Sequence, residues 1–210
     1  HNNRRVAPVQ SLTAEERSVI FGTLLGDFSL LRPHKTANPR LAFSHGLPQE
    51  DYAKHKMGVL HRFSWYWRII DSDGYKPDGK LIVGSCSCMP IFNEVLSLVC
   101  PGGSKVVTES WLDLVDSQAL AYWFMDDGST SWSKTNLAFV AFHTEGYSVA
   151  ENDLICSWFK ARGCCSARVA RSKGKPYLYL PREDGFRLLA EVSPFLHSSM
   201  RYKEEGPRHG

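Results

Sequence analysis

The sequence predicts an α+β fold made of two similar lobes in one chain. Three observations support this prediction. The chain has 210 residues, enough for two small domains. Its helix and strand patterns occur in the same order in both halves, and Cys100-Pro-Gly-Gly103 interrupts the chain near its middle. We therefore expect an N-terminal lobe over 1–103 and a C-terminal lobe over 104–210.

Helical spacing, alternation and capping residues define the elements of the first half. Thr13 and Glu16 form a capping box ahead of an apolar run, which predicts a helix that ends at Asp27. The patterns that follow predict a strand over 40–45, a helix over 51–63, strands over 66–70 and 81–87, and a helix over 90–99. Turn signals at Asp73-Gly74 and over 77–79 separate the last two strands.

The second half repeats this order. Asp116 or Ser117 caps an apolar helix that runs to Asp127 and Gly128. The remaining patterns predict a strand over 137–143, a helix over 150–161, a strand pair over 166–171 and 176–180, and a last helix over 183–193. The repeated order is a stronger indication of two related lobes than any single boundary.

Composition indicates a globular chain and excludes several classes of protein. Hydrophobic residues make up 43% and charged residues 22%. The longest apolar run, Ala119–Met125, is far shorter than the roughly 20 residues of a membrane span, so we expect no membrane partner. Residues 1–8 lack the apolar segment of a secretory signal. The six cysteines show no Cys-x-x-Cys pairing, which argues against a zinc ribbon and favours free thiols. A phosphate-binding loop and a His-Glu-x-x-His helix are also missing from the sequence.

Both apolar helices end in carboxylates, at Asp27 and at Asp127. The C-terminus of a helix carries partial negative charge, so each acid there costs up to about 1 kcal/mol. A simple Asp-Gly turn explains one such end, but two at matching places indicate that a cation lies between them. Mg²⁺ prefers oxygen ligands of this kind. Gly22 and Gly26 are spaced for a close helix crossing that brings the two acids together, with Ala121 and Met125 as the partner stripe.

The two helix ends also resemble a known pair of motifs. Leu-Ala-Tyr-Trp-Phe-Met-Asp-Asp-Gly over 120–128 resembles the second copy of the LAGLIDADG motif, and Phe-Gly-Thr-Leu-Leu-Gly-Asp over 21–27 resembles the first. Over residues 15–203 the chain resembles the single-chain, two-motif LAGLIDADG homing endonucleases. The resemblance implies two pseudo-symmetric αββαββα lobes, a saddle of antiparallel sheets over the DNA major groove, and motif helices at the lobe interface.

The same resemblance implies an activity and its residues. Asp27 and Asp127 would hold Mg²⁺ or Mn²⁺ against the scissile phosphates, with Lys105 and Lys203 polarising water or offsetting charge. A solvated side chain is the alternative for each lysine. A monomer would then make a double-strand break in DNA at a long asymmetric target. Phe28 stands where the family has a small residue, and either turns into its own lobe or blocks the partner helix.

Two stretches without acids, 28–49 and 160–182, are candidates for phosphate-facing surfaces, although a solvated face is the simpler interpretation. Alternation places Arg40 and Ser44 on one strand face, and Lys175 and Tyr177 on another. We expect contacts to nucleic acid from Arg40, Ser44, Arg168, Arg171, Lys173, Lys175 and Tyr177. Core packing is the alternative for the tyrosine.

The net charge of +3 is low for a protein that grips a long duplex. A second function therefore stays open: an RNA-binding maturase, or a structural component of a ribonucleoprotein, that uses the fold without cutting DNA. The family's intron-encoded members imply an organellar location, with the mitochondrion ahead of the chloroplast.

Overall fold

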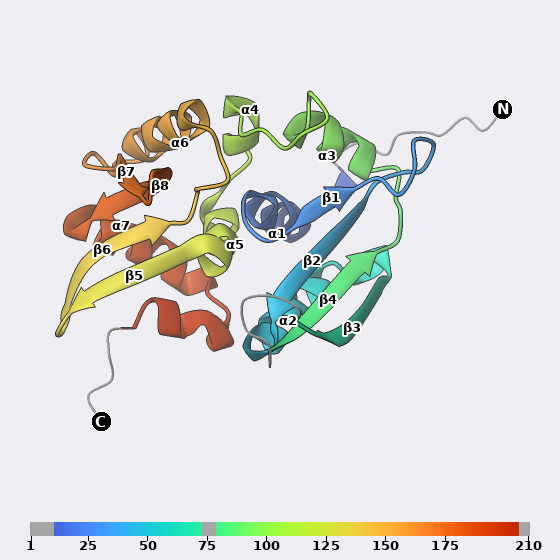
Figure 1. Cartoon of the computed structure of the whole chain (residues 1–210), viewed down its shortest axis with the longest axis horizontal. Coiled ribbons are helices and arrows are strands. Elements are labelled where there is room, and N and C mark those ends of the chain that lie inside the picture. The colour runs from blue at the N-terminus through green and yellow to red at the C-terminus, as the bar shows by residue number, and fades with distance from the viewer. Residues whose placement is uncertain (1–10, 73–78, 206–210) are drawn as a thin grey trace.

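The structure of the protein is a computed structural model that describes residues 11–72 and 79–205. The turn signals over 73–78 and the segment over 1–8 lie outside the described residues. Two antiparallel sheets of four strands each, with helices packed against them, confirm the predicted α+β fold. Figure 1 shows the two sheets on opposite sides of the molecule, with helices between them.

The first sheet and its helices come from the first half of the chain. The helices are α1 (Ala14–Leu25), α2 (Glu50–Val59) and α3 (Phe92–Val99). The strands are β1 (Ser29–Leu31), β2 (Arg40–Gly46), β3 (Trp65–Asp71) and β4 (Lys80–Cys86), in the spatial order β1-β2-β4-β3. The predicted capping box is present, because Thr13 and Glu16 each bond the other's backbone N–H.

The second sheet has the same order, β5-β6-β8-β7. Its strands are β5 (Gly128–Ser133), β6 (Asn136–Phe142), β7 (Arg168–Ser172) and β8 (Lys175–Pro181), and its helices are α5 (Ser117–Asp127), α6 (Val149–Ala161) and α7 (Arg182–Val192). A short helix, α4 (Glu109–Leu112), precedes α5. The identical strand order makes the two halves pseudo-symmetric; the boundary between residues 103 and 104 stays a prediction.

The sequence prediction missed β1 and β5, the strands that follow the two central helices directly. β1 has only three residues, and β5 reads Gly-Ser-Thr-Ser-Trp-Ser without an apolar alternation. Both are strands because they pair with the next strand, and the pairing is equivalent in the two sheets: Ser29 lies opposite Ala42, and Ser129 opposite Ala141. Tertiary pairing, rather than local preference, defines them.

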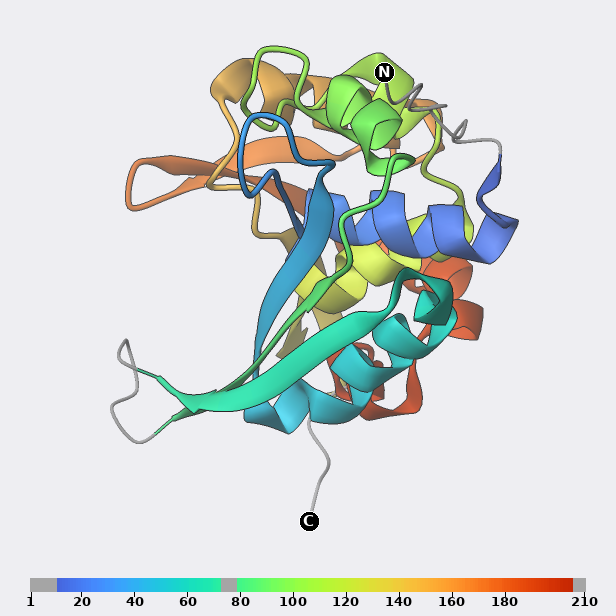
Figure 2. The same ribbon diagram turned by 90° about the vertical axis from the view of Figure 1, so that its right-hand side faces the viewer.

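The central helices α1 and α5 pack against each other between the sheets (Figure 1), and Figure 2 shows α1 in blue lying across α5 in yellow-green. Nearly every residue over 18–25 and over 119–125 is buried, as expected for helices that are apolar all round. A Cβ on Gly22 would collide with the carbonyl group of Ala119. The glycine stripe of α1 therefore lies at a close helix crossing, as predicted. Its partners on α5 are Ala119 and Asp126, so the predicted partner stripe of Ala121 and Met125 is wrong.

The buried apolar side chains of both halves form one continuous core that includes the two central helices. The two lobes are therefore packed as one body rather than as independent units. In the described part of the chain, no helix is long and apolar enough to cross a bilayer. The cysteines of the described residues are all free thiols, as predicted.

Candidate functional site

The helix crossing brings the carboxyl-terminal ends of α1 and α5 together. A Cβ on Gly26 would lie 2.5 Å from the Cβ of Asp126, so only glycine allows this approach. At the same point the backbone N–H of Asp27 donates to Oδ2 of Asp126 at 3.2 Å. Asp27, Asp126 and Asp127 therefore meet at the interface between the lobes.

These carboxyl groups lie in an environment that disfavours negative charge. Burial, followed by the charge of Asp126, raises the pKa of Asp27 to about 6. Burial, followed by the charges of Asp27 and Asp126, raises the pKa of Asp127 to about 7. Like charges that are held together and partly desolvated are stabilised by a cation, so these carboxylates are candidates for a metal site.

The two predicted lysines lie at the ends of the two central helices. The ammonium of Lys105 donates to the carbonyl of Leu24 at 2.9 Å, in the last turn of α1. That of Lys203 donates to the carbonyls of Phe124 at 3.3 Å and Asp126 at 3.0 Å, in the last turn of α5. Burial lowers the pKa of both ammonium groups, and the aspartates oppose that shift. Neither lysine is merely solvated: each supplies positive charge to a helix end that has no basic residue in its own last turn.

The structure adds a buried lysine that sequence analysis missed. Lys56 of α2 is completely buried, and its Nζ lies 3.0 Å from Oδ1 of Asp126 and 2.8 Å from Nε2 of His45. The hydroxyl of Tyr52 donates to the same Asp126 oxygen at 2.9 Å. On the other side of the imidazole, His45 Nδ1 lies 3.3 Å from Oδ2 of Asp27. Lysine is rarely buried without a partner, but the sequence pattern of α2 does not indicate that this partner lies in the other lobe.

Within the described residues, potential ligand atoms of Asp27, His45 and Asp126 lie within 4.8 Å of one another. His45 and Asp126 are already used by protein partners. An ammonium can only donate, so Nε2 of His45 accepts from Lys56 and Nδ1 carries the hydrogen. Both Asp126 oxygens accept hydrogen bonds. The carboxylates with capacity for a cation are therefore Asp27, whose side chain is 33% exposed, and Asp127. Hard oxygen donors of this kind fit Mg²⁺ or Mn²⁺.

Phe28 leaves the space beside Asp27 open. Its side chain turns into the core of its own lobe, where it stacks on Phe43 with ring centres 5.9 Å apart and lies against Trp65. The Lys56 ammonium sits 4.8 Å from the centre of the Phe28 ring. Of the two orientations considered for this bulky residue, the structure has the one that does not block α5.

The predicted nucleic-acid residues of β2 lie on the face of the first sheet opposite its core. Leu41 and Phe43 are buried, whereas Arg40 and Ser44 point the other way, as alternation predicts. A groove on this face also contains Tyr66 and Arg68 of β3. These two residues were missed, although their spacing in the predicted strand 66–70 places them on one face. The buried Nε of Arg40 has no hydrogen-bond partner among the described residues.

In the second sheet, the two predicted arginines lie on opposite faces. Tyr177 and Lys175 point away from buried Leu178, and Arg168 lies over the Tyr179 ring at 4.2 Å on that same face. Arg171 lies in register with Pro176, on the opposite face, and donates to the carbonyl of Gly174. Lys173 forms the two-residue turn with Gly174, both with positive φ, as a tight hairpin requires.

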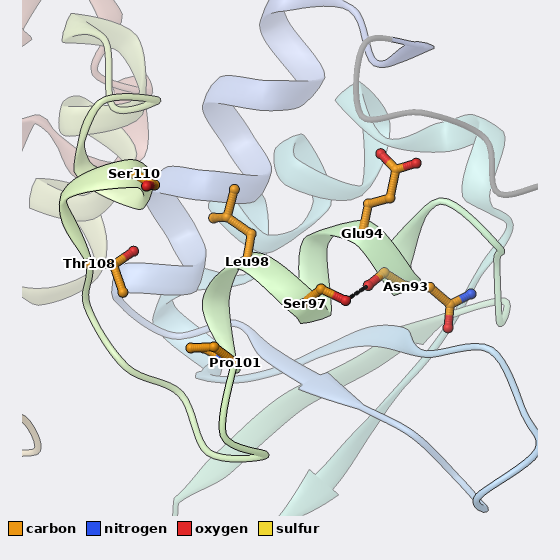
Figure 3. Close-up of a pocket in the computed structure, with 7 residues that line it drawn as sticks. All are labelled: Asn93, Glu94, Ser97, Leu98, Pro101, Thr108 and Ser110. Atoms are coloured by element: carbon orange, nitrogen blue, oxygen red, sulfur yellow. Dashed lines mark hydrogen bonds between the residues drawn. The ribbon is translucent and has the colours of Figure 1, made fainter.

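The groove between α3 and α4, drawn in Figure 3, is separate from the residues described so far. Asn93, Glu94, Ser97, Leu98, Pro101, Thr108 and Ser110 line it. A hydrogen bond from Ser97 to the Asn93 carbonyl is internal to α3. The groove therefore contains none of the carboxylates, lysines or arginines that point to a function.

Comparisons with known proteins agree with this geometry. The model of the LAGLIDADG DNA endonuclease family matches residues 17–188. The chain is 30% identical over 95 residues to "Probable intron-encoded endonuclease 1" of Wickerhamomyces canadensis, which covers 44% of this chain and 41% of that protein. It is 26% identical over 204 residues to "Protein RecA" of Mycolicibacterium chitae, covering 91% and 47%. The chain thus spans less than half the length of both relatives.

The fold also matches a solved structure, that of the homing endonuclease I-WcaI bound to its DNA recognition sequence. The TM-score is 0.80 at 19% identity, and the match covers 91% of this chain and 86% of that one. The TM-score establishes the likeness of the fold, and at this low identity the comparison shows the fold alone.

Proposed function

Because the chain belongs to the LAGLIDADG DNA endonuclease family, we propose that it cuts double-stranded DNA with divalent metal ions held by Asp27 and Asp127. The observation that carries this proposal is the close crossing of α1 and α5 at Gly26, which places the motif carboxylates together at the lobe interface. Their raised pKa values support a site that is completed by a cation.

The residues of this chain divide the work of phosphodiester cleavage. Asp27 and Asp127 would hold Mg²⁺ or Mn²⁺, which when bound supplies a nucleophile at neutral pH and stabilises the charge on the leaving oxygen. Lys105 and Lys203 place ammonium groups beside the two carboxylates, where positive charge stabilises the additional negative charge of the transition state. Burial lowers the pKa of each ammonium, so each also gives up a proton more readily than a solvated lysine.

The polar faces of the two sheets are the proposed DNA-binding surface. Arg40, Ser44 and the unpredicted Arg68 lie on the first sheet, and Arg168, Lys175 and Tyr177 on the second. Arginine reads guanine through two hydrogen bonds, while lysine mostly contacts phosphate. The two faces carry different side chains in one chain, which supports an asymmetric target bound by a monomer. We also propose an organellar origin, with the mitochondrion ahead of the chloroplast; the likeness to an intron-encoded endonuclease supports an intron as its source.

The test is to incubate the protein with a randomised duplex library and Mg²⁺, and to sequence the cut ends. We expect double-strand breaks at one long, asymmetric sequence, and no cutting with EDTA in place of Mg²⁺. The structured-RNA alternative is tested in parallel. If no duplex is cut, and tight RNA binding survives the combined Asp27→Asn and Asp127→Asn substitutions, the endonuclease proposal is wrong and the protein is an RNA-binding scaffold.

A further inference from the structure

Lys56 acts on Asp27, the aspartate of the first motif, through two neighbouring side chains, one of which comes from the second lobe. Through Asp126, it fixes the carboxylate that accepts the backbone N–H of Asp27. Through His45, it fixes an imidazole beside the Asp27 side chain. The ammonium donates to Nε2, so Nδ1 carries the hydrogen and donates it to Oε1 of Gln49 at 3.1 Å, and the same nitrogen lies 3.3 Å from Oδ2 of Asp27. We call Lys56, His45 and Asp126 the Lys56 hub. Both routes from the hub end on Asp27.

The hub is tightly constrained. The side chains of Lys56, His45 and Asp126 are all 0% exposed. The Lys56 ammonium also lies 4.3 Å from the centre of the Tyr52 ring and 4.8 Å from that of Phe28. A buried ion pair is poor evidence of a stabilising device, because desolvation of the two charges offsets their attraction. Retention of such a pair beside a candidate catalytic carboxylate instead indicates a positioning role, in which packing locks the geometry.

Over its described residues, 104–205, the second lobe has no equivalent hub. Ser29 pairs with Ala42 and Ser129 with Ala141, so the strands that follow the two motifs correspond residue by residue. When this correspondence is extended along the chain from Ala42 and Ala141, Ile155 is the counterpart of Lys56 and Thr144 is the counterpart of His45. The burial pattern of Ala53–Leu60 then matches that of Asn152–Phe159 at every position. Ile155 and Thr144 are both 0% exposed, but neither carries a charge.

The partner carboxylate is asymmetric in the same way. Asp126 of the second motif stands where the first motif has Gly26, and it points into the pocket that Lys56, His45 and Tyr52 form in the first lobe. The backbone N–H of Asp27 is thus bonded by the hub and its side chain lies 3.3 Å from the hub imidazole, whereas among the described residues no hydrogen bond or ion pair joins a hub side chain to the Asp127 side chain.

We propose that Lys56 is a positioning residue for Asp27 alone, acting through Asp126 and His45, so that its loss impairs one of the two cutting centres. This inference rests on the proposed function. One strand of the DNA is then cut with a centre that depends on the hub, and the other strand with a centre that does not. Displacement of a catalytic group by about 1 Å can slow a reaction by roughly 100-fold.

The test compares Lys56→Met/Asp126→Asn with Lys54→Met on a duplex that carries a different label on each strand. The double variant removes both buried charges together, so neither is left unpaired. Lys54 is the control, since it is a 46% exposed lysine of the same helix. We expect the double variant to cut one strand about 100-fold more slowly and the other at nearly the wild-type rate, so that nicked DNA accumulates. Equal slowing of both strands, or of neither, would overturn the proposal.

A second variant and a second readout do not depend on the double variant or on turnover. His45→Phe keeps the ring but removes the nitrogen that faces Asp27, and it should slow the same strand. Mn²⁺ binding to the DNA-free protein, followed by electron paramagnetic resonance, should weaken by at least about tenfold for one ion in both hub variants and remain unchanged in Lys54→Met. Wild-type protein that neither cuts nor binds Mn²⁺ would contradict the proposed function. Wild-type protein that does both, with hub variants that match it, would contradict only the role of Lys56.

Discussion

At the scale of single residues, the site depends on carboxylates that are held in an environment unfavourable to them. Asp127 ends a buried helix, beside two other aspartates, and the lysine nearest its own helix end comes from the far end of the chain. No intrahelical interaction accounts for an acid at this position. The proposed role in binding a cation would account for it.

Asp127→Asn tests that role directly. The substitution keeps the size of the side chain and removes a metal ligand without touching the polar faces of the sheets, so DNA affinity should stay within about threefold of wild type, a change of less than about 1 kcal/mol. Double-strand cleavage should be lost. Gel-shift affinity and plasmid linearisation measure the two effects separately. A variant that linearises plasmid normally would remove Asp127 from the metal site.

The raised pKa of Asp127 also predicts a pH dependence of stability. The unfolded chain loses this proton near pH 4 and the folded chain near its pKa of about 7. Between these values the folded state binds more protons, so the free energy of unfolding falls as pH rises. Without metal, Asp127→Asn should therefore gain stability relative to wild type between about pH 5 and pH 8, by at most about 1.4 kcal/mol per pKa unit.

Urea unfolding of both proteins in EDTA measures this difference. The pKa of His45 is lowered to about 4, chiefly by burial, and its titration contributes in the opposite direction. His45 is present in both proteins, so its contribution cancels in the comparison. A stability difference that stays constant across this pH range would show that Asp127 titrates normally.

At the scale of elements, α1 and α5 can cross closely because Gly22 and Gly26 have no side chains at the contact. Gly22→Ala should destabilise the protein by about 1–3 kcal/mol, since the added methyl group meets backbone atoms of Ala119 that cannot move aside. Gly58→Ala is the matched control in α2, because no atom lies within 4 Å of its added Cβ. It should stabilise by about 0.5–1 kcal/mol. Thermal unfolding of the two variants compares them, and equal effects would mean that the helices can separate at no cost.

The hairpin of β7 and β8 offers a second comparison at this scale. Arg168 lies on the polar face of the sheet and Arg171 on the other. If the polar face binds DNA, Arg168→Ala lowers the slope of log affinity against log salt by about one unit, as expected for one lost phosphate contact. Arg171→Ala should leave the slope unchanged. The reverse result would mean that DNA lies along the end of the hairpin rather than across the sheet.

At the scale of the whole molecule, two pseudo-symmetric halves share one core. The second half supplies what a partner subunit would otherwise contribute: Asp126 to the first lobe, and Trp111 Nε1 to the Phe21 carbonyl of α1. We expect one 23.7 kDa chain per duplex. Light scattering of the complex formed with EDTA would measure this stoichiometry, and two chains per duplex would contradict the proposed monomer.

The repeat of elements, the two capped apolar helices, the glycine stripe and the paired acids are all local patterns, and the sequence by itself determined them. Periodicity predicts such elements because helix and strand geometry repeat over a few residues. The polar and buried faces of β2 and β8 follow from the same alternation. These patterns were enough to predict two lobes with carboxylates at their interface.

The strands β1 and β5, the Lys56 hub and the orientation of Phe28 were decided only by the tertiary structure. β5 is a polar segment that becomes a strand by pairing with β6. Lys56 has the spacing of any lysine on an amphipathic helix, and its partner Asp126 comes from the other lobe. A charge can be buried only where its partner is, and that partner is brought to it by the crossing of two helices that the sequence places about one hundred residues apart.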